Sequence, residues 1–79
     1  MKSLAAKLDD DLVFQAMGTV VRIEGTTVVV AAEYPGSRGR AELRARRAVS
    51  CLIEPKLHDF VLLGGQGRTV YVLAVLERE

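Results

Sequence analysis

The residues best suited to covalent chemistry in this sequence are one thiol and one imidazole, Cys51 and His58. A cysteine nucleophile needs a base within hydrogen-bonding reach and a third group that orients the base. Cys51 precedes two apolar residues, Leu52 and Ile53, a context typical of a small buried hydrophobe rather than an exposed nucleophile. No serine stands in a G-x-S-x-G elbow. We therefore expect no catalytic residues and a protein that is not an enzyme.

Metal and cofactor ligands are also sparse. Cys51, His58 and Asp59 would supply three ligands, but their spacing matches no zinc pattern. The acidic run 9–11 lacks the alternating ligand spacing and the glycine of a calcium loop. The glycine-rich run 64–67 lacks the Lys-Ser/Thr ending of a phosphate loop, so we interpret it as a hairpin turn. The sequence predicts neither a metal site nor a cofactor.

A basic face is the strongest electrostatic feature. Arg40, Arg44 and Arg46 fall on one side of the alternating segment 40–46, opposite smaller apolar residues. Such a face would follow a nucleic-acid backbone, dock on an acidic protein surface, or keep a strand edge soluble. Single-strand binders also need aromatic side chains for base stacking, and none of the four aromatics lies in this segment. Protein docking is therefore preferred, with an OB-type single-stranded nucleic-acid-binding domain as the alternative function.

Composition sets the scale of the elements that must position these residues. Seventy-nine residues, 49% hydrophobic and 27% charged, predict one small folded domain rather than a disordered chain. No run of about 18 uncharged residues exists for a membrane span. The net charge of +1 argues against DNA or an anionic membrane as a bulk electrostatic partner. A single cysteine cannot form an internal disulfide, so oligomerisation, or attachment to more chain, is the leading extra source of stability.

The pattern divides the chain into an N-terminal segment, 1–13, and a barrel domain, 14–79. Leu4, Leu8 and Leu12 recur at helical spacing, which predicts a short helix or a flexible segment. This segment lacks the uninterrupted apolar core of a signal peptide, and one cysteine fits a reducing compartment, so we expect a cytoplasmic protein.

The barrel domain reads as all-β. Five strands are expected, at 15–23, 26–33, 40–46, 60–63 and 68–76. Valines on both faces of the second strand predict burial on both sides. A bulge at Arg47 would return Val49 to the core. Five short antiparallel strands with tight turns favour a small closed barrel, OB-like, with an SH3-like barrel as the alternative.

The last strand carries more apolar surface than so small a barrel can hide. Strict alternation places one apolar set inside and the row Tyr71, Leu73 and Val75 outside. An exposed row of this kind is typical of a protein interface. A sister subunit, the leucine stripe of the N-terminal segment, or further chain would each cover it.

Several segments resemble a known family. The segments 18–21 (GTVV), 45–52 (ARRAVSCL), 54–55 (EP) and 70–78 (VYVLAVLER) are similar to an uncharacterised bacterial family, a domain of unknown function found in type VI secretion gene clusters. The run 45–52 is the most specific of these matches. The sequence departs from the common Pro-x-x-Gly-Asp-x-Val signature of small barrels because His58 replaces the glycine. If this position has a positive φ, His58 is strained relative to glycine.

The family that the sequence resembles neighbours spike-tip proteins with the proline-alanine-alanine-arginine repeat. The resemblance therefore implies a role beside the spike of a contractile injection apparatus, whose spikes contain trimers of OB-like domains. We therefore expect an assembly or adaptor module that binds a spike, tip or effector protein and that is itself a homo-oligomer, with a trimer favoured. The resemblance supplies no catalytic residues.

Overall fold

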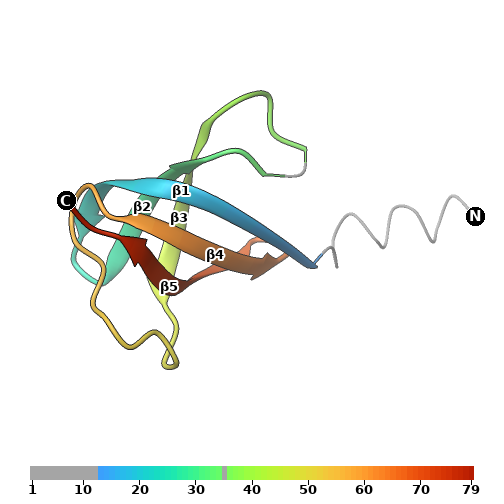
Figure 1. Ribbon diagram of the computed structural model, residues 1–79. Helices are drawn as coiled ribbons and strands as arrows, with labels where there is room; N and C mark the ends of the chain where they lie inside the picture. Colours follow the sequence, from blue (N-terminus) through green and yellow to red (C-terminus); the bar gives the residue numbers. More distant parts are fainter. Residues whose placement is uncertain (1–12, 35) are drawn as a thin grey trace, which may run out of the picture.

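The computed structural model describes residues 13–34 and 36–79, and within them the chain is all-β (Figure 1). The strands are β1 (Val13–Glu24), β2 (Thr27–Ala32), β3 (Ala41–Arg47), β4 (Phe60–Gln66) and β5 (Thr69–Glu77). The expected segment 1–13, with its leucine stripe at Leu4, Leu8 and Leu12, lies outside the described residues except for Val13, where β1 begins. No helix long and apolar enough to cross a membrane occurs in the described ranges.

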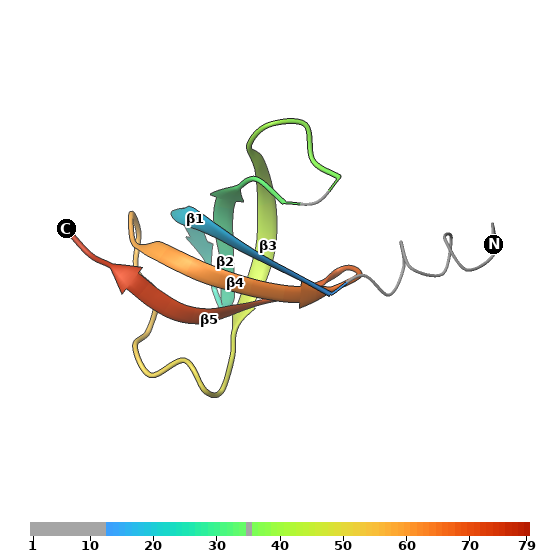
Figure 2. The same cartoon turned by 45° about the vertical axis from the view of Figure 1, so that its right-hand side comes forward.

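The five strands form a closed barrel in the order β1-β2-β3-β5-β4 (Figures 1 and 2). This confirms the all-β, OB-like barrel. Four of the strand pairs are antiparallel, whereas β3 and β5 are parallel, so the expectation of an entirely antiparallel barrel is wrong at this one seam. The seam is also short: only Arg46 with Tyr71 and Arg47 with Val72 are in register.

The first strand is long because it belongs to both halves of the barrel. Residues Val13 to Thr19 pair with β4, and residues Gly18 to Glu24 pair with β2. The register with β2 shifts between Val20 and Arg22, which marks a bulge at Val21. A bulge bends a strand and increases its twist, which lets β1 turn from one neighbour to the other.

The core is built from small branched side chains. The fully buried members include Val20, Val30, Val61, Leu63 and Val72. Val28, Val29 and Val30 are all buried, which confirms the two-sided burial expected for the second strand. Val28 and Val30 belong to the core cluster, while Val29 does not. Val29 is in register with Arg22 and Arg44, so we place it on the outer face beneath these arginines.

Two glycines of the run 64–67 lie in β4 and not in the turn, which corrects the interpretation of that run. A Cβ on Gly64 would meet Leu73 Cδ1 at 2.6 Å, and one on Gly65 would meet Phe14 Cε1 at 2.8 Å. These glycines are therefore needed for close approach of neighbouring side chains. The turn itself is formed around Gly67, which has a φ of 60°.

Candidate functional site

An apolar surface projects from the connection between β3 and β4, residues 48–59, which we call the β3–β4 loop. The loop leaves the strands on the side of the barrel opposite the β2–β3 connection in both ribbon views (Figures 1 and 2). Val49 is fully exposed, Leu52 is 92% exposed, and Ile53 and Leu57 are about half exposed. The expected return of Val49 to the core is therefore wrong. Large apolar side chains exposed together on one short loop are characteristic of interaction surfaces.

The first half of the loop is fixed to the barrel through Cys51, which is buried as expected. Arg47, at the end of β3, donates from Nε and Nη2 to the Cys51 carbonyl oxygen at 3.0 and 2.9 Å. The Cys51 thiol donates to the Ile53 carbonyl oxygen at 3.2 Å. The Ala48 amide donates to the Val72 carbonyl oxygen at 3.0 Å, which continues the pairing of β3 with β5 into the start of the loop. The cysteine thus has a structural role in shaping the loop.

The second half is fixed by a buried carboxylate. Asp59 is 1% exposed and accepts hydrogen bonds from Arg78 Nε at 2.9 Å, Arg78 Nη2 at 2.7 Å and the Lys56 amide at 2.8 Å. Arg78 Nη2 also donates to the Glu54 carbonyl oxygen at 3.0 Å. The hydrogen bonds from Arg78 hold the pKa of Asp59 below its usual range, so the carboxylate stays charged. One ion pair therefore connects the loop to the residue that follows β5.

A third attachment joins the loop to β1. The His58 amide donates to the Val20 carbonyl oxygen, and the Val20 amide donates to the Asp59 carbonyl oxygen, both at 2.9 Å. His58 has a φ of 74°, the conformation in which a glycine is favoured, so the strain expected at this position is present. These contacts come beside the bulge at Val21 and bring the loop against the end of the barrel.

The residues expected to form an outward row on the last strand do not form one. The register of β5 with β4 shifts between Leu62 and Leu63, which leaves Leu73 as a bulge. Tyr71 is 41% exposed, Leu73 is half-buried over Gly64, and Val75 is half-buried against the core. The alternation expected for Tyr71, Leu73 and Val75 is wrong because the bulge reverses the side-chain direction after Leu73. Their role as an interface stays a prediction.

Of the three arginines predicted to form a basic face, Arg44 is paired with an acidic neighbour. Arg44 pairs with Glu24, Glu24 pairs with Arg22 at 2.8 Å, and Arg22 pairs with Glu42 at 3.0 Å. Hydrogen bonds from Arg22 and Arg44 lower the pKa of Glu24. This network joins residues of β1 and β3 that flank β2, where Val29 is buried in register with Arg22 and Arg44. Arg40 donates to the Ala31 carbonyl oxygen at 3.2 Å instead of joining the network.

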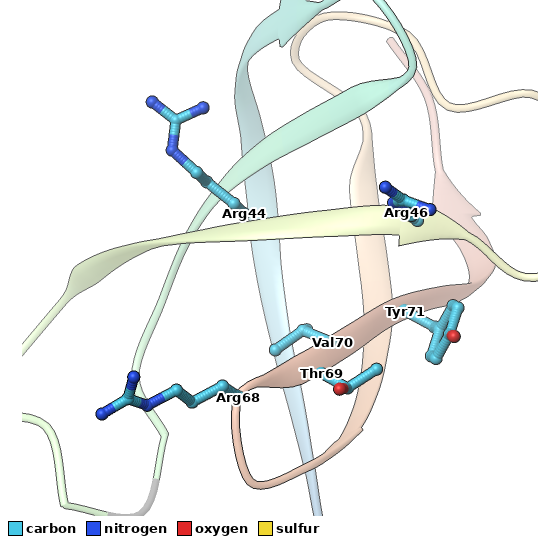
Figure 3. A pocket seen from close by; sticks show the side chains of 6 residues that line it. All are labelled: Arg44, Arg46, Arg68, Thr69, Val70 and Tyr71. Carbon is cyan, nitrogen blue, oxygen red and sulfur yellow. The ribbon is translucent and has the colours of Figure 1, made fainter.

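Arg46 contributes to a different feature, a cleft where β3 and β5 separate (Figure 3). The cleft has a volume of about 340 Å³ and is lined by Arg44, Arg46, Arg68, Thr69, Val70 and Tyr71. Its charged lining is entirely cationic. The structure thus brings two of the three predicted arginines together with Arg68 and one aromatic ring, and leaves Arg40 elsewhere.

Sequence reasoning missed the apolar loop residues and Arg68. The run 49–57 contains four large apolar residues at helical spacing, but Pro55 within it disfavours a helix, and this combination is itself a signal of an exposed apolar connection. Arg68 gave no comparable signal, because only the packing of β5 beside β3 brings it near Arg46. The described residues contain no group of three or more His, Cys, Asp or Glu side chains able to hold a metal ion.

The comparisons with known proteins identify a family and a fold but give no function. A family model described as "Protein of unknown function (DUF3540)" matches residues 14–79. A solved structure, apo-CusF residues 6–88 from Escherichia coli, superposes with a TM-score of 0.59 at 16% identity, covering 87% of this chain and 90% of that chain. At this identity the likeness supports the barrel fold alone. No curated protein matches the sequence.

Proposed function

This chain belongs to the DUF3540 family of proteins of unknown function, and we propose that it is a non-enzymatic assembly module of a type VI secretion apparatus that binds a spike, tip or effector protein. The observation that supports the proposal best is the β3–β4 loop, in which exposed apolar side chains stand on a backbone fixed at three places. A pre-organised surface avoids much of the entropic cost of ordering a loop on binding.

The chemistry of this surface favours a protein partner. Val49, Leu52, Ile53 and Leu57 are aliphatic, and all four are exposed on one loop. Small-molecule sites are usually concave and combine apolar walls with a few convergent polar groups. Projecting aliphatic side chains are instead covered by a complementary apolar surface, which a protein partner supplies. The resemblance of the sequence to a family of secretion gene clusters favours the particular apparatus.

Self-association is part of the same proposal, with a trimer as the favoured state. A domain of this size buries a limited share of its surface alone, so covering the loop would add stability to the assembly. Light scattering across protein concentration measures the stoichiometry directly. A particle that stays monomeric at every concentration would remove self-association from the proposal but leave a different partner protein to be tested.

The central experiment is the variant Leu52→Glu. Because this side chain is 92% exposed, the variant should fold with an unchanged unfolding midpoint. Its capture by a co-expressed spike-tip protein carrying the proline-alanine-alanine-arginine repeat should fall by about tenfold or more, because a charge would be buried in an apolar interface.

The matched control is Gln66→Glu, which adds the same charge at an exposed position at the other end of β4. This variant should bind as the wild type does. Equal capture of the Leu52→Glu protein would remove the loop from the interface, and failure of the wild type to associate with spike, tip or effector proteins would overturn the proposed function.

A further inference from the structure

Beside the seam between β3 and β5, two strand edges have no strand paired with them among residues 13–34 and 36–79. β3 begins at Ala41, but its pairing with β5 starts only at Arg46. β5 begins at Thr69, and its first residue paired with β3 is Tyr71, two positions later. Alternate residues of a strand direct their N–H and C=O groups to each side. The stretch from Ala41 to Ala45 therefore presents backbone hydrogen-bonding groups toward a gap. At about 3.3 Å per residue, this free edge is about 16 Å long.

The cleft described above occupies this gap, and its walls are cationic. In Figure 3, Arg44 on β3 and Arg68 in the β4–β5 turn lie at opposite margins of the opening, and Val70 lies between the two strands. Arg44 is partly neutralised by Glu24. Arg46 and Arg68 take part in none of the ion pairs found among the described residues. Open strand edges and two guanidinium groups outside the ion pairs of the described residues thus meet in one place.

We infer that this cleft binds an extended acidic segment of a partner protein, which adds a strand to the free edge of β3 and places carboxylates on Arg46 and Arg68. Strand addition to an exposed edge supplies backbone hydrogen bonds, and alternate side chains supply specificity. Arg46 and Tyr71 lie on the outer face, whereas Val70 is buried. The bound segment should therefore alternate acidic residues, facing the arginines, with small apolar residues, facing Val70.

An acidic peptide fits this site better than a single-stranded nucleic acid does. Nucleic-acid binders combine a basic groove with several aromatic platforms on which successive bases stack. Here Tyr71 is the one aromatic side chain that lines the cleft. The inference stands apart from the proposed function, because the cleft and the β3–β4 loop use different residues.

The test is a binding titration with a fluorescein-labelled eight-residue peptide in which glutamate alternates with valine. Arg46→Ala and Arg68→Ala should each weaken binding by about tenfold, since each removes a charge-assisted contact. Arg38→Ala is the matched control, because it removes an exposed arginine that does not line the cleft. Leu52→Glu should leave peptide binding unchanged, which separates this result from the test of the loop.

Two further measurements make the inference specific. Hydrogen exchange should slow at amides of the stretch Ala41 to Ala45 when the peptide is bound, and a peptide of the same composition with its glutamates in one block should bind more weakly. Absence of saturable binding, equal binding of the block peptide, or unchanged exchange would overturn strand addition. Tighter binding of labelled oligothymidylate that is lost in Arg46→Ala and Arg68→Ala would overturn the inference and assign the cleft to nucleic acid.

Discussion

Replacing Asp59 with asparagine should release the second half of the β3–β4 loop. Asparagine has the shape of aspartate but carries no charge. Both carboxylate oxygens of Asp59 accept hydrogen bonds, so the asparagine amide nitrogen would face a donor from Arg78 in either orientation. The wild-type carboxylate accepts from the Lys56 amide and from two nitrogens of Arg78. At least one of these hydrogen bonds is lost in the variant, and the others lose their ionic character. From hydrogen bonds to charged groups, we expect a loss of about 3 kcal/mol in the free energy of unfolding.

This loss is large for a domain of 79 residues, whose total stability is expected to be about 4–12 kcal/mol. Urea unfolding followed by circular dichroism measures it as a lower midpoint at pH 7. The matched control is Glu54→Gln, the same chemical change in the same loop. The Glu54 carboxylate reaches only Lys56 at 3.4 Å and both side chains are mostly exposed, so this variant should lose about 0.5 kcal/mol or less.

The stability contributed by the Asp59–Arg78 ion pair should fall as the pH falls. Because Arg78 lowers the pKa of Asp59 in the folded protein, the stability from this pair is fully present above the unfolded-state pKa, about 4. It is lost as the pH falls through the lower folded-state pKa. The deficit of Asp59→Asn should therefore be full at pH 7 and shrink once the wild-type carboxylate is protonated. A variant as stable as the wild type at pH 7, or a deficit that persists unchanged in acid, would refute the role of this ion pair.

Three other expectations follow from single contacts. An NMR titration should give Glu24 a pKa below that of an ordinary glutamate, and Arg22→Ala should return it toward that value, because the hydrogen bond from Arg22 is the largest cause of the shift. Gly18→Ala should cost about 3 kcal/mol in urea unfolding and Gly64→Ala about 1 kcal/mol, since the first new Cβ meets a backbone oxygen and the second meets a movable leucine side chain. His58→Gly should stabilise the protein by about 0.5–1 kcal/mol by relieving its positive φ, whereas an alanine there should bring no gain in the unfolding midpoint.

The strands were predictable because their signals are local. Alternation and β-branched residues identified all five, and Gly25, with a φ of 63°, marks the first hairpin turn as expected. Burial of β2 on both faces also followed from its unbroken valines. These features depend on residues that are neighbours in the chain, so the sequence pattern carries them directly.

The errors arose where a property depends on residues distant in sequence. The bulge at Leu73 follows from how β5 registers with β4, and it reversed the direction predicted for Val75. The neutralisation of Arg44 depends on Glu24, twenty positions away on another strand. The burial of Asp59 depends in the same way on Arg78. A charge pattern along one strand therefore could not show which arginines remain available to a ligand.

The short pairing between β3 and β5 also determines where the barrel opens. Separating these two strands breaks the pairs at Arg46 and Arg47 and the hydrogen bond from Ala48 to Val72. It leaves a curled sheet in the order β3-β2-β1-β4-β5, with β1 in the middle and every remaining pair antiparallel. The barrel can thus open between β3 and β5 while the other strand pairs stay hydrogen-bonded. Thermal fluctuations should separate β3 from β5 before they break any other strand pair. The barrel can therefore widen at this seam without a change in the order of its strands.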